Sequence, residues 1–267
     1  MQTTTDVEEK LDDLHRVLER YRGAVVAFSG GVDSALVAAV AARALGHRAL
    51  AVTAVSPSLP PGELAEARRI AAEIDIRHRS VRTDEVDDEN YLANGPDRCY
   101  YCKDELYGVL RRIADEEGLP VVASGANVDD LGDVRPGLRA AAERDVRHPL
   151  IEAGFTKLGV REASRGLGLP TWDKPQSACL SSRIPFGVRI TVEDLSRVGR
   201  AERALKEMGF RQVRVRVHGD LARVEVEQDD IARAVELREQ ISQALTELGY
   251  RFVALDLQGF RSGSMNP

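Results

Sequence analysis

Short apolar runs alternate with amphipathic stretches over the first part of the chain. An opening helix is predicted by apolar side chains at helical spacing, namely Leu11, Leu14, Leu18 and Tyr21. An apolar run with β-branched residues at 24–28 then predicts a buried parallel strand, and further strands are predicted at residues 49–55, 76–81 and 121–125. Helical patterns separate these runs, at residues 35–45, 63–74 and 103–118. Because strands alternate with helices, the sequence predicts an α/β fold with a doubly wound parallel sheet, whose ligands bind at the carboxyl ends of the strands.

Two stretches lack this alternation. Residues 83–98 are rich in acidic side chains and show no apolar period, which predicts a surface loop. Residues 171–190 are also irregular, but they contain aromatic and apolar side chains that argue against disorder. A long ordered loop of this kind is usually functional.

The last part of the chain predicts a small α+β domain. Helical patterns cover residues 192–208 and 231–248, and residues 252–257 predict a strand. Alternating side chains before and after His218-Gly219-Asp220 predict a β-hairpin. We therefore predict three parts: a larger domain over residues 1–170, an active-site loop over residues 171–190 and a small domain over residues 191–267.

Composition and charge narrow the classes of partner. The net charge of −6, with 37 basic and 43 acidic residues, makes a nucleic-acid partner a poor fit. The sequence has no apolar run of about 18 residues, as a membrane span requires. The polar start has no apolar leader, which indicates a cytoplasmic protein. The odd number of cysteines, 3, argues against a disulfide framework.

A glycine loop, Ser29-Gly30-Gly31-Val32-Asp33-Ser34, joins the first strand to the following helix. Glycines let the backbone approach a polyanion, the amides at the helix start face it, and Ser29 and Ser34 add hydroxyl donors. The loop has no Walker A lysine and no Gly-x-Gly-x-x-Gly spacing. Asp33 would repel phosphate unless a divalent cation lay between them, which predicts Mg²⁺. The alternative is a tight strand-to-helix turn with a serine cap.

The glycine loop resembles the PP-loop of the ATP pyrophosphatases, which include GMP synthetase, NAD synthetase, argininosuccinate synthetase and tRNA thiolases. The resemblance covers about the first 170 residues. It implies that ATP is cut between its α and β phosphates, which leaves an adenylated substrate and pyrophosphate. It also implies that the backbone around Val52 and Ala54 holds adenine, and that Gly125, within Ser124-Gly-Ala-Asn127, lies beside the nucleotide.

A second segment is more specific: Trp172-Asp-Lys-Pro-Gln-Ser-Ala-Cys179-Leu-Ser-Ser-Arg-Ile-Pro-Phe-Gly187. It resembles the cysteine segment of the LarE family of sulfur transferases, and Cys99-Tyr-Tyr-Cys102 and the small final domain fit the same family. The resemblance implies a step in building the nickel-pincer nucleotide of lactate racemase. The implied substrate is pyridinium-3,5-dicarboxylate mononucleotide, whose carboxylates become thiocarboxylates. Members of the family form hexamers, so we also expect a homo-oligomer.

The candidate residues suit this chemistry. Adenylation gives a carboxylate AMP as a leaving group, and a thiolate such as that of Cys179 can then attack. Nearby Lys174 and Arg183 could favour the thiolate, although a lone cysteine is often a small buried apolar residue. We assign the binding of the substrate's anionic groups to the Ser182 hydroxyl and to the guanidinium groups of Arg183, Arg214 and Arg216. Arg214 and Arg216 alternate with valines along a strand, so the two arginines share one face of it. The alternative interpretation of these two arginines is a solvated basic surface.

The cysteines leave two mechanisms open. In some LarE proteins a single cysteine at the position of Cys179 gives up its sulfur and becomes dehydroalanine. Others carry three cysteines that are thought to hold a [4Fe–4S] cluster, and Cys99, Cys102 and Cys179 resemble this second type. Three thiolates leave one iron open to sulfide, so we favour the ligand role. The alternative for Cys99 and Cys102 is a pair of partly buried thiols at a helix start.

The sequence therefore predicts an ATP-dependent sulfur transferase that acts on a small nucleotide-like dicarboxylate, with ATP, Mg²⁺ and a [4Fe–4S] cluster. One alternative is a tRNA thiolase with the same loop and a cluster. The acidic composition and the absence of an added zinc-binding or RNA-binding region argue against it. Another alternative is a non-catalytic nucleotide-binding assembly protein, which the intact glycine loop and cysteine segment oppose.

Overall fold

The computed structural model describes residues 4–132 and 136–261 of the chain. They form two compact units. The first unit contains Met1–Ser56, Gly62–Glu85 and Cys99–Gln176, and the second contains Pro57–Pro61, Val86–Arg98 and Ser177–Pro267. Among the described residues, no helix is both long and apolar enough to cross a membrane.

The first unit is built on a parallel sheet with strand order β3-β2-β1-β4. Its strands are β1 (Ala24–Ala27), β2 (Ala49–Val55), β3 (Arg77–Arg82) and β4 (Val121–Ala123). Both faces of β1 and β2 are covered, which explains why their sequences are almost continuous apolar runs. The predicted α/β fold with a parallel sheet is confirmed.

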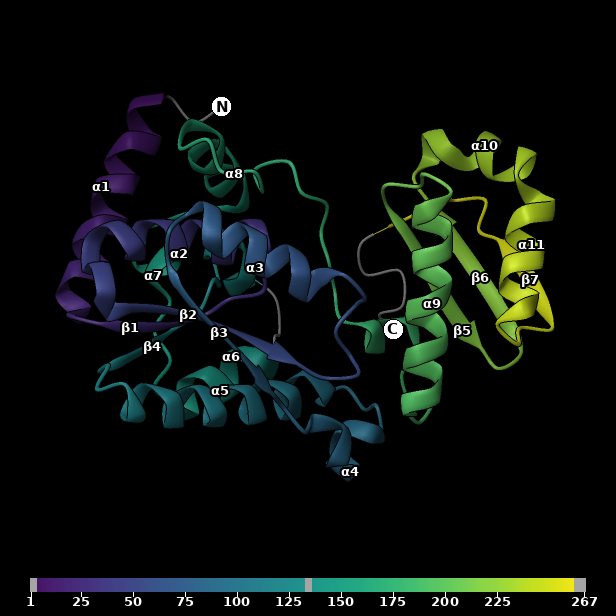
Figure 1. The fold of residues 1–267 in the computed structure, drawn as a ribbon, viewed down its shortest axis with the longest axis horizontal. Helices are drawn as coiled ribbons and strands as arrows, with labels where there is room; N and C mark the ends of the chain where they lie inside the picture. Colours follow the sequence, from purple (N-terminus) through teal and green to yellow (C-terminus); the bar gives the residue numbers. More distant parts are fainter. Residues whose placement is uncertain (1–3, 133–135, 262–267) are drawn as a thin grey trace. The chain divides into compact units, whose positions relative to one another are not determined.

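Helices cover both faces of this sheet (Figure 1). One face packs against α1 (Thr4–Tyr21), α2 (Val32–Leu45), α3 (Glu63–Glu73), α7 (Pro149–Glu152) and α8 (Lys157–Gly166). The other packs against α5 (Arg98–Glu116) and α6 (Pro136–Glu143). Helix α2 lies against the sheet and also contacts α1 and α8. Its alanine-rich sequence suits that position, because small side chains allow close packing on several sides.

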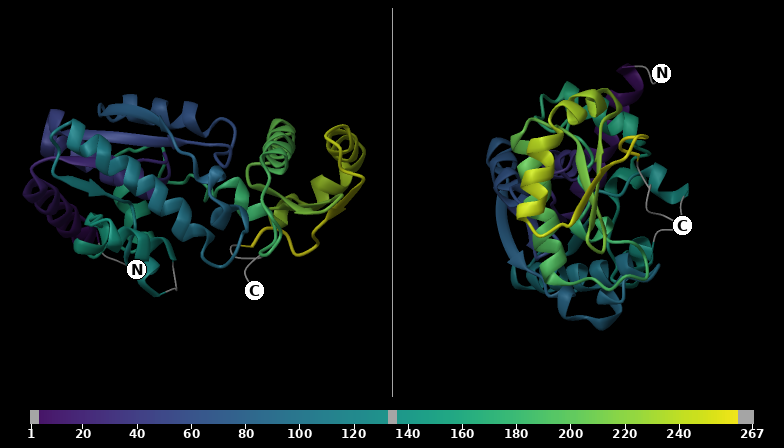
Figure 2. Two further views of the ribbon diagram at one scale, coloured as in Figure 1. Left: turned by 90° about the horizontal axis from the view of Figure 1, so that it is seen from below. Right: turned by 90° about the vertical axis from the view of Figure 1, so that its right-hand side faces the viewer.

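The second unit contains a three-stranded sheet with order β5-β6-β7. The elements follow as α9 (Val192–Glu207), β5 (Val213–His218), β6 (Leu221–Val226), α10 (Ile231–Glu236), α11 (Arg238–Glu247) and β7 (Phe252–Leu255). Strands β5 and β6 form the predicted hairpin, with Gly219 in the left-handed region at φ +62°. Helices α9 and α11 contact each other and pack on the sheet (Figure 2). The predicted small α+β domain is confirmed, but its second helix is interrupted at Leu237.

The prediction of a surface loop over residues 83–98 was wrong. This stretch contains the short helices η2 (Glu85–Asp87) and α4 (Glu89–Leu92) and the first residue of α5. Tyr91, Asn94 and Arg98 are buried there. Asn94 donates to the carbonyls of Pro185 and Val188, each at 2.8 Å. Polar side chains hold the stretch in place, so an apolar period could not reveal it.

Candidate functional site

The glycine loop (Ser29–Ser34) connects β1 to α2 and has an internal hydrogen-bond network. The Ser29 amide donates to the Ser34 hydroxyl at 3.2 Å, and that hydroxyl donates to the Gly31 carbonyl at 3.1 Å. Gly30 has φ +71°, and a Cβ there would lie 3.2 Å from the Ala67 Cα, so only glycine fits without strain. Hydrogen bonds within the loop and the contact of Gly30 with Ala67 therefore fix its shape, with the start of α2 behind it.

A second segment, Ser124 to Asn127 after β4, packs directly on this loop. A Cβ at Gly125 would lie 2.9 Å from the Ser34 amide nitrogen, so a side chain there would displace the glycine loop. The Asn127 amide donates to Asp33 Oδ1 at 3.3 Å. The structure thus brings together Gly125 and Asp33, two residues that the sequence placed beside the nucleotide.

The end of β2 supports the glycine loop from its other side. The Val52 carbonyl accepts from the Phe28 amide at 2.9 Å, which joins β2 to the residue before the loop. The buried Thr53 hydroxyl donates to the Phe28 carbonyl at 2.8 Å and also bonds the His78 ring at 2.8 Å. Val52 is buried and Ala54 is half-buried. The assignment of adenine to this stretch of backbone stays a prediction.

Two lysines lie at the glycine loop: Lys157 was missed by the sequence reasoning, and Lys174 was expected to act on Cys179 instead. The Lys157 ammonium forms an ion pair with the Asp33 carboxylate. The Lys174 ammonium donates to the Gly30 carbonyl at 3.2 Å and pairs with Glu63 at 3.0 Å. Lys157 stands at the first residue of α8, after the cap Thr156. A cation is unfavourable at a helix N-terminus, and this exception to the usual pattern is the signal that could have revealed Lys157.

Cys179 belongs to the second unit, where its backbone is firmly held. The Cys179 carbonyl accepts from the Ser182 hydroxyl and from Arg183 Nη1, both at 2.9 Å. Arg183 is 1% exposed and forms a bidentate pair with Glu202 at 2.8 and 2.9 Å. Arg183 therefore fixes the backbone at Cys179, while the Cys179 side chain is half-buried and carries a free thiol.

Arg214 and Arg216 lie side by side on β5 and are both buried, which excludes a solvated basic surface. Arg216 pairs with Glu225 through Nε at 3.0 Å and Nη2 at 2.8 Å, and Nη1 donates to the Ser182 carbonyl at 2.9 Å. Arg214 donates to the Val213 carbonyl at 2.9 Å. Burial above all, together with the charges of Arg183 and Arg216, lowers the pKa of Arg214 to about 10.

Arginines and carboxylates form one connected group of charges here. Arg183 and Arg216 pair with Glu202 and Glu225, and Arg223 contacts Asp256 at 3.6 Å as well as Glu225 at 3.1 Å. The charges of this group also act on Arg214. A buried group with several guanidinium groups suits an anionic ligand, because guanidinium groups bind carboxylates and phosphates through paired hydrogen bonds.

Cys99 and Cys102 lie in the first turn of α5, which begins earlier than the predicted residue 103. Their spacing of three residues places them on the same side of the helix. Cys99 is exposed and Cys102 is half-buried, and neither forms a disulfide. Cys99 and Cys102 belong to the first unit and Cys179 to the second. Within the described ranges, no three His, Cys, Asp or Glu side chains are grouped so that they could hold a metal ion.

Comparison with known proteins relates the chain to nucleotide-dependent synthases. The asparagine synthase family model matches residues 13–125, a range that contains the glycine loop and Gly125. An uncharacterized protein of Synechocystis is 48% identical over 97% of this chain and 98% of its own length. The pyridinium-3,5-bisthiocarboxylic acid mononucleotide synthase of Lactiplantibacillus plantarum is 39% identical over 96% of this chain and 91% of its own length. The chain belongs to the LarE family, to which that synthase also belongs.

Proposed function

We propose that this protein is an ATP-dependent sulfur transferase that acts on pyridinium-3,5-dicarboxylate mononucleotide. It adenylates a carboxylate of this substrate and converts it to a thiocarboxylate for the nickel-pincer cofactor of lactate racemase. One observation carries the proposal. The glycine loop is braced by Gly125 and Asn127, within a chain that is 39% identical to a synthase of the bisthiocarboxylic acid mononucleotide.

ATP binds at the glycine loop in this proposal. The backbone and hydroxyl groups of Ser29, Gly30, Gly31 and Ser34 bind the phosphates, and the stretch at Val52 and Ala54 holds adenine. Asp33 would hold Mg²⁺, which neutralises phosphate charge when it is bound. The Asp33 carboxylate suits this ion, because Mg²⁺ prefers oxygen ligands. A substrate carboxylate oxygen attacks the α-phosphorus, the α–β bridging bond breaks, and pyrophosphate leaves with the bonding electrons.

The substrate binds in the second unit through Ser182, Arg183, Arg214 and Arg216. Its phosphate and carboxylates are anions, and guanidinium groups bind such anions through paired hydrogen bonds. Arg183 and Arg216 also shape this site, because they bind the backbone at Cys179 and Ser182. The same residues would therefore place the activated carboxylate relative to the cysteine.

Cys179 takes part in the sulfur step, and we propose that Cys99, Cys102 and Cys179 together hold a [4Fe–4S] cluster. The donors fit such a group, because none of the three cysteines forms a disulfide, and Cys99 and Cys102 share one side of a helix. When bound, the cluster would supply an open iron for sulfide.

The test is substrate-dependent exchange of labelled pyrophosphate into ATP, followed by mass spectrometry of the nucleotide product. We expect exchange only when the dicarboxylate is present, and a gain of sulfur in the product. Exchange that depends on tRNA would instead support a tRNA thiolase. Absence of exchange with either substrate would support a non-catalytic protein. Iron and sulfide content after anaerobic purification tests the cluster separately.

We also propose that three parts of the chain have different roles. Residues 1–170 form the ATP pyrophosphatase domain, residues 171–190 the active-site loop, and residues 191–267 a domain for substrate binding and oligomerisation. The enzyme works in the cytoplasm, where cysteines that form no disulfide, such as these, remain reduced.

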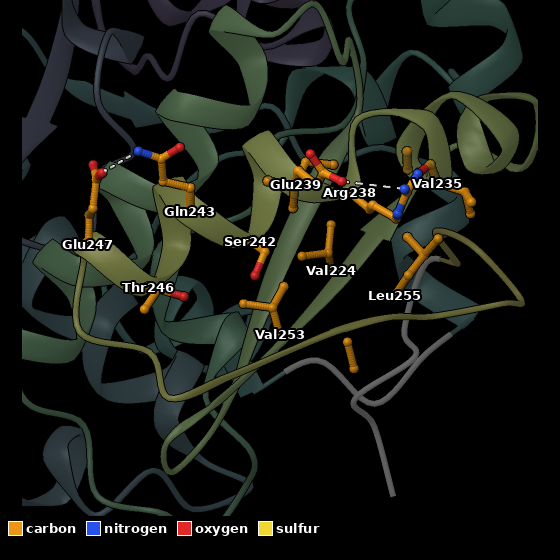
Figure 3. Close-up of a pocket in the computed structure, with 13 residues that line it drawn as sticks. Val224, Val235, Arg238, Glu239, Ser242, Gln243, Thr246, Glu247, Val253 and Leu255 are labelled. Atoms are coloured by element: carbon orange, nitrogen blue, oxygen red, sulfur yellow. Dashed lines mark hydrogen bonds and ion pairs between the residues drawn. The ribbon is translucent and has the colours of Figure 1, made fainter.

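A homo-oligomer, which would be a hexamer in this family, is supported by the surface of the second unit. A pocket of about 780 Å³ lies between α11 and the strands β6 and β7, with Val224, Ile241, Val253 and Leu255 among its lining residues (Figure 3). Exposed Phe252 and Leu257 add apolar surface. Light scattering of the purified protein measures the number of subunits, and a monomer at micromolar concentration would contradict this proposal.

A further inference from the structure

Asp33 lies in a closed ring of hydrogen bonds within the first unit. Its Oδ1 accepts from the Asn127 side chain at 3.3 Å, and the Asn127 side-chain oxygen accepts from the Asp129 amide at 3.0 Å. The Asp129 carboxylate accepts from the Lys157 amide at 2.8 Å. The Lys157 ammonium closes the ring on Asp33 Oδ2. Because the Asp129 amide fixes the Asn127 side chain, its NH₂ group must face Asp33.

In this ring both oxygens of Asp33 are bound by protein donors. The carboxylate that would hold Mg²⁺ is therefore neutralised by the Lys157 ammonium. A divalent cation at Asp33 would have to displace this ammonium or lie close to it. Like charges a few ångströms apart repel, and the repulsion is stronger near a partly buried carboxylate than in bulk water. The Asp33 side chain is 23% exposed, so this repulsion is only partly screened.

The surroundings of Lys157 also allow its ammonium to leave. Its side chain is 39% exposed, so part of it already lies in solvent. It begins α8, where the helix dipole repels a cation, and Asp33 offsets this repulsion. ATP phosphates at the glycine loop would offer the ammonium a second anionic partner. Lys157 can therefore exchange one anion for another.

We propose that Lys157 is a positioning residue that keeps a divalent cation off Asp33 until the phosphates of ATP draw its ammonium away. The inference rests on the proposed function, since it requires ATP and Mg²⁺ at the glycine loop. Metal and nucleotide then bind cooperatively, because each favours the state in which the ion pair between Lys157 and Asp33 is open. Such coupling is reciprocal: the metal tightens ATP binding by the same factor by which ATP tightens metal binding.

The test is a titration with Mn²⁺, which binds oxygen ligands as Mg²⁺ does and is counted by the electron paramagnetic resonance signal of the free ion. Without nucleotide we expect weak binding to the wild-type protein and binding about tenfold or more tighter to Lys157→Met. Lys157→Arg keeps the charge and should behave like the wild type. The double variant Asp33→Asn with Lys157→Met should lose the gained site.

The titration is then repeated with α,β-methylene-ATP, which cannot lose pyrophosphate. The analogue should tighten Mn²⁺ binding to the wild type by a larger factor than in Lys157→Met. If Lys157→Met binds Mn²⁺ as weakly as the wild type without nucleotide, the inference is wrong. If Asp33→Asn binds Mn²⁺ with the analogue as the wild type does, the metal role of Asp33 in the proposed function fails instead. The two failures are thus distinguishable.

Discussion

Gly31 is the residue at which phosphate binding can be blocked with least damage to the fold. Its φ of −81° suits any amino acid, and among the described residues a Cβ there would meet only the Ser29 hydroxyl, at 3.3 Å. Gly31→Val should therefore fold but fill the space where phosphates bind, and substrate-dependent ATP–pyrophosphate exchange should be lost. The control is Gly166→Val, because a Cβ at Gly166 meets no atom within 4 Å in the part of the chain that the structure describes. Wild-type exchange in a folded Gly31→Val protein would show that the glycine loop does not bind the phosphates of ATP.

Arg214 tests the substrate site, because it lies among the buried charges of the second unit and has no part in ATP binding in our proposal. Arg214→Ala should weaken substrate binding by about ten- to hundredfold, since losing a charge-assisted hydrogen bond costs about 1.5–3 kcal/mol. ATP binding should be unchanged, and calorimetry with each ligand measures both. Arg211→Ala, at an exposed arginine three residues earlier, is the control. Unchanged substrate affinity in Arg214→Ala would leave this arginine with a structural role alone.

Individual site residues could be predicted only where their sequence neighbours restrict them. The glycine loop was identifiable because glycines between a buried strand and a helix suit a polyanion, and Gly125 does lie against that loop. The partners of the arginines could not be predicted. The ion pairs of Arg183 with Glu202 and of Arg216 with Glu225 form across separate elements, so the spacing of residues along the chain does not reveal these pairs. Lys157 was missed for the same reason, as Asp33 lies 124 positions away.

Asn94 shows how polar side chains can hold an element that lacks an apolar period. It is 0% exposed with φ +56°, donates to the carbonyls of Pro185 and Val188, and accepts from Arg98. Asn94→Ala should lower the free energy of unfolding by about 2–4 kcal/mol, as buried polar groups lose their partners. Asn94→Gly should lower the free energy of unfolding by about 1 kcal/mol less than Asn94→Ala does, since glycine accepts a positive φ without strain.

Urea unfolding measures both Asn94 variants. Asn90→Ala is the control, because the Asn90 side chain makes an exposed hydrogen bond to Asp88 at 3.0 Å and should change stability by less than about 0.5 kcal/mol. Equal stability of Asn94→Ala and the wild type would show that residues 86–98 contribute little to the second unit.

Strands and helices with a strong apolar pattern were the elements that the sequence could predict. Strands β1 and β2 follow from short apolar runs, and the β5–β6 hairpin follows from alternation and from turn residues. The helix boundaries were less predictable. Helix α5 starts at Arg98, before its apolar period begins, because Arg98 is bound by Asn94 and by the Ser181 carbonyl. Tertiary contacts of this kind set the ends of elements and are invisible in local patterns.

At the scale of the whole molecule, the sequence could predict a nucleotide-binding α/β unit followed by a small α+β unit. It could not predict that Pro57–Pro61 and Val86–Arg98 belong to the second unit. Hydrogen bonds far apart in sequence place them there: the Leu180 amide donates to the Ser58 carbonyl at 2.8 Å, and the Ile190 amide donates to the Leu92 carbonyl at 2.9 Å. Backbone pairing of this type depends on no particular side chain, so composition gives no indication of it.

The last prediction concerns Cys179 and involves cysteines from both units. As a sacrificial donor, Cys179 would attack the adenylated carboxylate, release AMP and form a thioester. Cleavage of its Cβ–S bond would then leave dehydroalanine, so the protein would become lighter by about 34 Da after one turnover. As a cluster ligand, Cys179 would keep its sulfur and the enzyme would turn over repeatedly with external sulfide.

We favour the ligand role, because Cys99 and Cys102 lie on one side of α5 without forming a disulfide, and a sacrificial mechanism would not require either of them. Intact mass spectrometry before and after an anaerobic reaction should show an unchanged mass after many turnovers. Cys99→Ala should abolish both sulfur transfer and the iron absorption, while ATP–pyrophosphate exchange continues. Tyr100→Phe, beside Cys99, should keep all three properties. A stoichiometric mass loss at Cys179, with Cys99→Ala still active, would establish the sacrificial mechanism instead.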